Sequence, residues 1–138
     1  MNVLVDTSVW SLALRRPENS PITPEQEATV SALADLVRDG RAVLIGAIRQ
    51  ELLCGIKTPG QFEALSDSLA AFEDMALPRQ VHESAAQAFN TCRANKVQGS
   101  NTDFLICAVS IHHHLPIFSL DSDFVIYRRW LPVRFYKP

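Results

Sequence analysis

The chain has 138 residues, of which 47% are hydrophobic and 20% charged, and this size and composition predict one globular domain over residues 1–138. The mean hydropathy is +0.03, no apolar run approaches the roughly 18 residues of a membrane span, and no leader pattern opens the chain. We therefore expect a cytoplasmic protein without a membrane segment. A net charge of −2 excludes a general polyanion binder, so local basic patches would have to hold any nucleic-acid substrate.

Predicted strands and helices alternate along the chain, each recognised from its hydrophobic period. The predicted strands are Val3–Val5, Ala42–Ile45, a brief one at Met75–Leu77, Pro116–Leu120 and Val133–Tyr136. The predicted helices cover residues 9–14, 24–38, 47–54, 59–72, 81 to about 97 and 102–113, with a short one after Asp121. Their expected N-caps are Thr7 or Ser8, Thr23, Thr58, and Ser100 or Asn101. The alternation predicts a three-layer α/β/α sandwich with a mostly parallel sheet of about five strands.

Four acidic residues stand where such a fold could bring them together. Asp6 ends the first strand, and Asp121 directly follows the predicted strand Pro116–Leu120. The carboxyl ends of parallel strands meet at one edge of the sheet. Asp103 lies in the first turn of a buried helix, where the helix dipole favours an anion. Glu51 can reach the same edge from the helix after the second strand. Each acid alone has an ordinary structural explanation, but as a set they predict an acidic cluster.

A cluster of this kind predicts a divalent cation. Carboxylates a few ångströms apart repel one another, so without a cation at least one would have a raised pKa and bind a proton. Oxygen ligands suit Mg²⁺ or Mn²⁺. Such a site can generate a hydroxide-like nucleophile and neutralise charge on a phosphoryl group, which is metal-assisted phosphodiester cleavage. The cation would also let a polyanionic substrate approach acids that otherwise repel it.

Four motifs occur in a characteristic order along nearly the whole chain: Val3–Val9, Arg49–Gly55, Asn101–Ala108 and Phe118–Phe124. Together they resemble the motifs of PIN-domain ribonucleases, and within that group those of the VapC toxins of bacterial and archaeal toxin–antitoxin pairs. The resemblance implies a metal-dependent endoribonuclease with RNA as substrate. It also implies a VapB-like antitoxin whose C-terminal segment occupies a groove near the active site, and frequent homodimerisation.

The resemblance also implies roles for individual residues. Asp6 and Asp103 would be the principal metal ligands, and Glu51 and Asp121 would complete the acidic pocket directly or through water. Supporting positions fall at Ser8, Ser119 and Asp123. Ser8 and Ser119 would supply hydroxyl groups. Asp121 and Asp123 both stand near the fourth acidic position, and Asp121 is favoured because it is nearer the strand end.

Two alternative functions remain open on the sequence. One is an aspartyl-phosphate phosphatase or phosphoacceptor with Asp6 as nucleophile, although Ser8 occupies the place of the second aspartate in a D-x-D motif. The other is a non-catalytic RNA- or partner-binding module of the same fold, in which the acids only make polar contacts.

Several other features are assigned structural roles. The run His112-His113-His114 is not expected to bind zinc, because consecutive helical residues point about 100° apart. Trp10 and Trp130 are expected to pack in the core or in a dimer rather than stack on bases. The three cysteines are expected to be reduced core thiols, since they lack C-x-x-C spacing: Cys54, Cys92 and Cys107. No phosphate-binding glycine loop is present.

Overall fold

Three short parallel strands form the centre of the computed structural model, which describes residues 1–17 and 19–138. The strands are β1 (Val3–Val5), β2 (Ala42–Val43) and β3 (Ile117–Phe118), and their order in the sheet is β2-β1-β3. Leu4 lies opposite Val43 on one side and Ile117 on the other. All three residues of β1 are completely buried, which explains why this strand is a continuous apolar run rather than an alternating one.

The sheet has fewer regular strands than the sequence predicts. A single parallel bridge joins Leu44 to Asp74, and another joins Ile117 to Phe135. Within the described residues, the expected five strands are therefore three strands and two isolated bridges, and the predicted strand Val133–Tyr136 is wrong as a regular strand. Its pairing is short because Pro132 and Pro138, on either side, have no N–H to extend the ladder.

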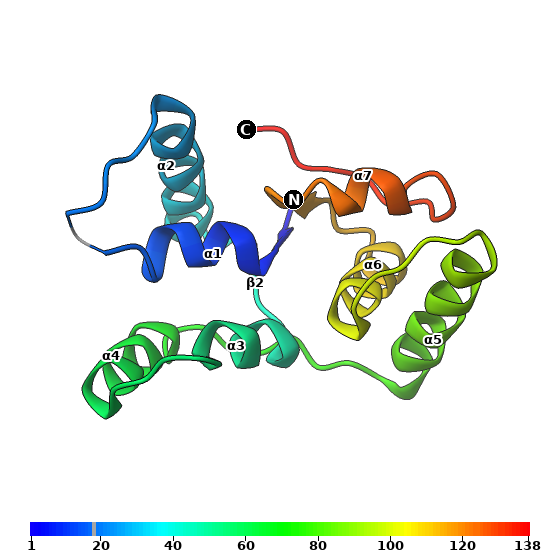
Figure 1. The fold of residues 1–138 in the computed structure, drawn as a ribbon, viewed down its shortest axis with the longest axis horizontal. Coiled ribbons are helices and arrows are strands. Elements are labelled where there is room, and N and C mark those ends of the chain that lie inside the picture. Colours follow the sequence, from blue (N-terminus) through cyan, green and yellow to red (C-terminus); the bar gives the residue numbers. More distant parts are fainter. Residues whose placement is uncertain (18) are drawn as a thin grey trace.

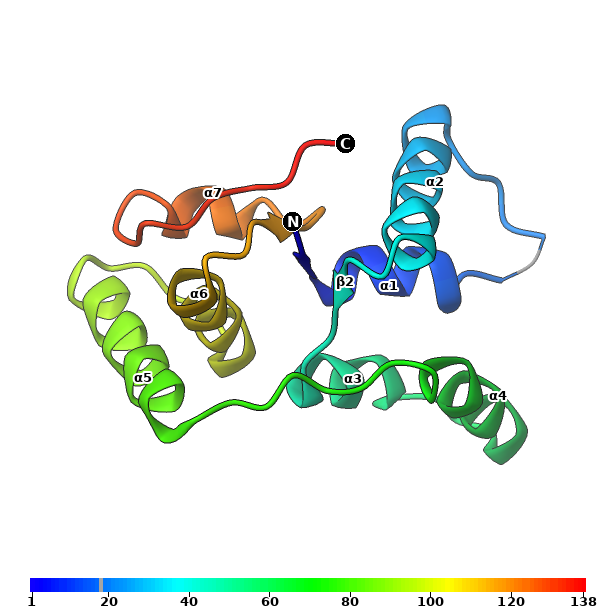
Figure 2. The ribbon, with the colours of Figure 1, turned by 180° about the vertical axis from the view of Figure 1, so that it is seen from behind.

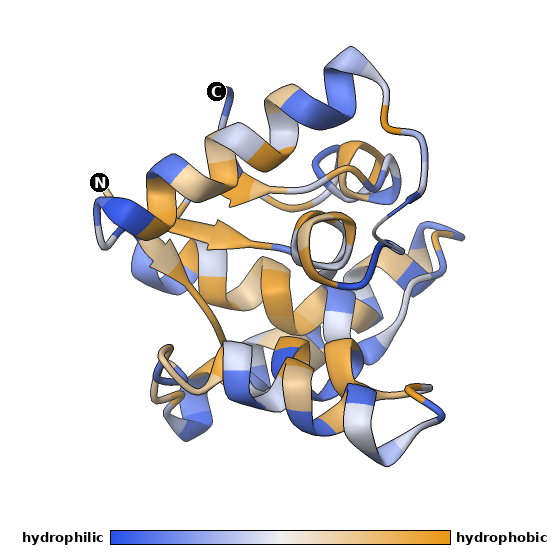
Figure 3. Cartoon of the chain, turned by 90° about the vertical axis from the view of Figure 1, so that its left-hand side faces the viewer, coloured by the Kyte–Doolittle hydropathy of each residue, from blue (hydrophilic) through white to orange (hydrophobic). Residues whose placement is uncertain are grey.

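Seven helices in the described chain cover the sheet on both sides. They are α1 (Thr7–Leu14), α2 (Pro24–Arg38), α3 (Gly46–Leu53), α4 (Pro59–Leu69), α5 (Arg79–Ala94), α6 (Asn101–His113) and α7 (Asp123–Tyr127). Helices α1–α4 lie on one side of the central strand and α5–α7 on the other (Figures 1 and 2). The predicted three-layer α/β/α class is thus confirmed. In Figure 3 the strands and the helix faces that line them are hydrophobic. None of the described helices meets the length and hydropathy needed to cross a bilayer.

Side-chain caps fix where most helices begin. Thr23 and Gln26 form the predicted reciprocal capping box of α2, and Ser100 accepts from the backbone N–H of Asp103 at the start of α6. The prediction for α1 is wrong: its N-cap is Asp6, whose side chain accepts from the N–H of Ser8. A carboxylate caps as well as a hydroxyl does, so this residue both ends β1 and starts α1.

The core also decides the sequence-based expectations for tryptophan and cysteine. Trp10 is only 2% exposed and packs edge-on against Phe72, so core packing is confirmed for it. Cys92 and Cys107 are buried, and burial raises the pKa of both thiols. Cys54 is exposed, so the expectation of a core thiol is wrong at that position.

Gly99 faces the tightest glycine environment in the described chain. A Cβ added there would lie 2.8 Å from Cζ of Tyr127 and 3.0 Å from Cε2 of Phe104, and closer still to the phenol oxygen. Both rings are buried, at 0% and 1% exposure, so neither can swing into solvent. The missing side chain at residue 99 therefore lets the loop before α6 lie directly on the ring of Tyr127.

We predict that Gly99→Ala lowers the free energy of unfolding by about 1–3 kcal/mol through overpacking. Gly60→Ala is the matched control, because nothing lies within 4 Å of its added Cβ and alanine favours a helix by up to about 1 kcal/mol over glycine. Urea denaturation of the two variants measures both effects. Equal midpoints for Gly99→Ala and the parent protein would contradict the packing described here.

Candidate active site

The carboxylate of Asp6 is buried at the carboxyl end of β1, with 5% of the residue exposed. Its Oδ2 accepts from the hydroxyl groups of Ser8 and Ser119, each at 2.7 Å, and from the N–H of Ser8 at 3.4 Å. The two hydroxyl oxygens in turn accept from the N–H groups of Leu120 (2.9 Å) and Asp121 (2.9 Å). The hydrogen bonds of Ser8 and Ser119 therefore link the residues after β3 to the end of β1.

All the hydrogen bonds that Asp6 makes with its side chain in the described chain go to Oδ2. This leaves Oδ1 for another ligand. The predicted supporting hydroxyl groups, Ser8 and Ser119, lie against Asp6 and hold one carboxylate oxygen in place. Such donors also offset the cost of burying a charged group.

Glu51 reaches the same edge from α3. Its Oε1 accepts a 2.6 Å hydrogen bond from the hydroxyl group of Thr7, the residue after Asp6. The glutamate is half-buried, because the neighbouring positions Ile48 and Leu52 on α3 are completely buried in the core. Glu51 therefore extends from the helix after the second strand and lies next to the end of β1, where the sequence predicts it.

Asp103 lies in the first turn of α6 and is half-buried. Its N–H donates to Oγ of Ser100 at 3.0 Å, and its Oδ2 accepts a 2.6 Å hydrogen bond from the phenol of Tyr127. Burial and the bond to this carboxylate raise the pKa of Tyr127, so the phenol keeps its proton and remains a donor. Tyr127 thereby fixes the direction of the Asp103 side chain.

Asp121 and Asp123 complete a tight group with Asp103. One carboxylate oxygen from each of the three lies within 4.8 Å of the others. Asp121 and Asp123 are exposed, and Oδ1 of Asp121 accepts from the N–H of Asp123 at 2.9 Å. The structure therefore brings both candidates for the fourth acidic position to Asp103, whereas Asp6 and Glu51 lie outside this group of three at the same sheet edge.

The charges of the cluster act on Asp103. Burial raises the pKa of its carboxyl above the ordinary value of 3.8, and the nearby charges of Asp121 and Asp6 raise it further. Hydrogen bonds from Tyr127 and Ser100 oppose this shift by stabilising the ionised form. Burial is the largest cause of the net increase, and the repulsion from Asp121 and Asp6 adds to it.

The donor set fits a small divalent cation. Oxygen atoms bound to Mg²⁺ at about 2.1 Å are roughly 3–4 Å apart, so small side-chain movements would let Asp103, Asp121 and Asp123 share one ion. Asp6 can offer its remaining Oδ1. The donors are carboxylates, which match Mg²⁺ and Mn²⁺ and not the sulfur or imidazole donors of a typical zinc site. His112 and His114 are exposed and lie outside the acidic group.

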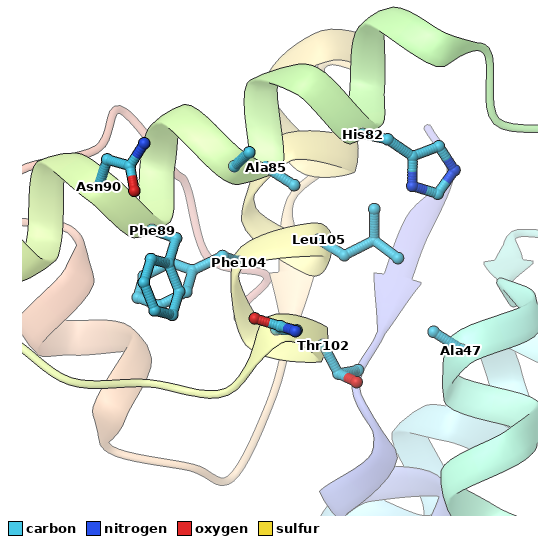
Figure 4. A pocket seen from close by; sticks show the side chains of 10 residues that line it. Ala47, His82, Ala85, Phe89, Asn90, Thr102, Phe104 and Leu105 are labelled. Carbon is cyan, nitrogen blue, oxygen red and sulfur yellow. The ribbon is translucent and has the colours of Figure 1, made fainter.

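A pocket of about 490 Å³ lies beside the first turn of α6 (Figure 4). Thr102 and Leu105 of α6, His82 and Phe89 of α5 and Ala47 of α3 line it. Thr102 precedes Asp103, but none of the acidic candidate residues, all of which the structure describes, belongs to the lining. The pocket is adjacent to the acidic site and is not the site itself.

Two side chains that hold the acidic residues in place are not identified by the sequence analysis. Thr7 was considered only as a helix cap, yet it donates to Glu51. Tyr127 was not singled out, yet it donates to Asp103. Tyr127 lies four residues after Asp123 in the predicted short helix, and this spacing is the sequence signal that both residues lie on the same side of it.

Comparisons with known proteins identify the family and the fold of the chain. A sequence model of the PIN domain matches residues 3–129. The solved structure of FitAcB from Neisseria gonorrhoeae has a TM-score of 0.73 at 20% identity, covering 99% of this chain and 97% of that one. VapBC2 from Rickettsia felis, bound to a promoter DNA fragment, has a TM-score of 0.73 at 14% identity, with 99% and 98% covered. The structure of FitAB bound to the IR36 DNA fragment has a TM-score of 0.71 at 19% sequence identity, covering 97% of this chain and 93% of that one. No curated protein matches.

We predict that Asp103 makes metal-free stability fall as pH rises. Its folded pKa lies above the ordinary 3.8, so the folded state binds the proton more tightly, and stability is lost on ionisation. The difference in Tm, Asp103→Asn minus parent, should therefore be larger at about pH 7 than at about pH 4. Thermal denaturation in chelator at both pH values measures it. A difference that does not change with pH would contradict the raised pKa of Asp103, which burial and the charges of Asp121 and Asp6 produce.

Proposed function

The chain belongs to the PIN domain family, and on that premise we propose that it is a metal-dependent endoribonuclease and the toxin of a VapBC-type toxin–antitoxin pair. The observation that carries the proposal is the grouping of Asp103, Asp121 and Asp123 within 4.8 Å, beside the buried Asp6. Carboxylates that come from three separate parts of the chain are typical of an acidic metal site and have no evident role in packing.

The proposed ligands are Asp6, Asp103, Asp121 and Glu51, with Mg²⁺ or Mn²⁺ as the cation. Asp123 is a further candidate ligand, because its carboxylate belongs to the group of three. When bound, the cation would lower the pKa of water and neutralise charge on the phosphoryl group. The protein itself orients the ligands: Ser8 and Ser119 hold Asp6, and Tyr127 holds Asp103. Asp121 and Asp123 are exposed, so a phosphodiester in solution can reach this side of the site.

The acidic site by itself repels the RNA backbone. Burial and, to a smaller extent, the charges of Asp121 and Asp6 already raise the pKa of Asp103, and phosphates would add further negative charge. A divalent cation reverses the sign of this local interaction. We infer that the metal governs RNA binding at the acids as well as the chemical step.

The toxin assignment is supported by the motif resemblance to VapC proteins and by similarity of fold. The solved structures with this fold carry the names VapBC2 and FitAB and were determined with DNA fragments. Applied to this chain, the proposal includes a VapB-like antitoxin that covers the site, and a homodimer. RNA as substrate is likewise part of the proposal.

We predict that the purified protein cleaves single-stranded RNA when Mg²⁺ or Mn²⁺ is added and that Asp6→Asn or Asp103→Asn lowers the rate by more than about a hundredfold, because a metal ligand is lost. A gel assay with end-labelled RNA measures cleavage. Asp67→Asn is the matched control, since this exposed aspartate lies on α4 outside the acidic group. Undiminished cleavage by the Asp6 and Asp103 variants would refute the site.

Metal binding should also stabilise the fold. At a hundredfold excess over the dissociation constant the linkage is roughly 3 kcal/mol, which corresponds to a rise in Tm of several degrees. We expect Asp103→Asn to abolish this rise and Asp67→Asn to retain it in differential scanning calorimetry. The absence of any metal-induced rise in Tm would instead favour the non-catalytic binding module, in which the acids only make polar contacts.

Toxicity can be tested separately from the chemistry. Expression in a bacterial host should arrest growth, whereas Asp6→Asn at the same protein level should not. The reason is that loss of the metal ligand removes cleavage while the fold is kept. Growth arrest that persists with Asp6→Asn would contradict a nuclease as its cause.

A further inference from the structure

Positive charge is concentrated in the segment 124–138. This segment has four cationic residues and no acidic one: Arg128, Arg129, Arg134 and Lys137. The rest of the chain has more acidic than basic residues, because the whole chain has a net charge of −2. All four cations are exposed, and no ion pair of the described residues includes any of them. An unneutralised basic segment thus directly follows the acidic cluster.

A small pocket lies between this segment and the acidic site. Its volume is about 190 Å³, which is on the scale of one nucleobase. Ser119 and Asp121 form one part of its lining, Val125 of α7 another, and Phe135 and Tyr136 a third. The pocket therefore shares two residues with the acidic site, and three aromatic residues belong to its wall: Phe124, Phe135 and Tyr136.

One of the cations, Arg128, lies against the ring of a lining residue, although it does not itself line the pocket. The guanidinium of Arg128 lies 5.1 Å from the centre of the Phe135 ring, an arrangement that stabilises the cation and limits its side-chain freedom. Arg128 is exposed, so its remaining N–H groups can bind an anion. The sequence after it continues with Arg129 and Trp130, which is 44% exposed, so a second cation and an exposed aromatic side chain follow directly.

We propose that this pocket binds one unstacked base of the RNA substrate, and that Arg128 and Arg129 bind the backbone phosphates beside it. The proposal rests on the proposed function, since it adds a specificity-determining subsite to the same acidic site. Aromatic walls suit a base because base and ring stack, and the free cations suit phosphates. A base inside a duplex cannot enter, so the substrate at this point is single-stranded.

Binding without metal tests the backbone part independently of cleavage. Fluorescence anisotropy of a labelled single-stranded RNA of about 12 nucleotides is measured in EDTA with the full chain. Arg128→Gln with Arg129→Gln should weaken binding about tenfold and lower the slope of log K against log salt by about 1.4, or 0.7 for each phosphate. The charge-matched control is Arg38→Gln with Arg79→Gln, two exposed arginines in exposed ion pairs on α2 and α5.

Filling the pocket tests the base part. Val125 lines the pocket and is 53% exposed, whereas its neighbour Ile126, 39% exposed, does not line it. We expect Val125→Trp to weaken binding of the single-stranded RNA about tenfold, the loss of one stacked base, and Ile126→Trp to leave it unchanged. Single-stranded RNA should bind more tightly than duplex RNA of the same length. Poly-glutamate that carries the same total negative charge should not displace the bound single-stranded RNA.

Four results would overturn the proposal: no binding of RNA in EDTA, equal weakening by the two arginine pairs, equal effects of the two tryptophan variants, or displacement by poly-glutamate. Cleavage of the same RNA with Mn²⁺ is recorded in parallel. Cleavage that is unaffected by the Arg128 and Arg129 variants leaves the nuclease standing and removes only the subsite. If binding depends on these arginines but no RNA is cleaved, the subsite stands and the proposed nuclease function is refuted.

Discussion

The buried carboxylate of Asp6 is the constraint on which the rest of the site depends. A charged group in this position costs several kcal/mol unless donors surround it, and the donors here come from two ends of the chain. Ser8 lies in the first turn of α1, three residues after the end of β1, and Ser119 directly follows β3. Because the same hydroxyl groups accept from the backbone of Leu120 and Asp121, holding Asp6 also places the acidic residues after β3. One hydrogen-bond network therefore sets both strand ends and the positions of their acids.

The second constraint is electrostatic repulsion. Asp103, Asp121 and Asp123 lie within 4.8 Å of one another without a cationic side chain among them, and burial keeps solvent from screening Asp103 fully. The contacts around Tyr127 hold this unfavourable arrangement: its ring packs against Phe104 and Phe124, and its phenol bonds to Asp103. Apolar packing thus stabilises the position of a carboxylate that its neighbours repel. A site that trades stability for ligand geometry in this way is common among functional sites.

Much of the fold could be predicted because the signals were local. The capping box at Thr23, the cap at Ser100 and the buried run Val3–Val5 each depend on a few adjacent residues, and the structure has all three. The errors arose where distant contacts decide. The segment around Phe135 has an apolar strand pattern but pairs through one bridge. Asp6, and not Thr7, caps α1, while the hydroxyl group of Thr7 is bonded to Glu51, which lies 44 residues away.

By itself, the sequence determined the order of strands and helices and the positions of Asp6, Glu51, Asp103 and Asp121 at their ends, because hydrophobic period and capping act within a few residues. It also determined that positive charge follows the last acidic motif. Only the tertiary structure decided which carboxylates lie together, which of their oxygens are already bonded, and that the basic segment borders a pocket shared with Ser119 and Asp121. The reason is that these relations depend on how strands and helices pack across the sheet, and no local pattern in the chain encodes a distance between residues a hundred positions apart.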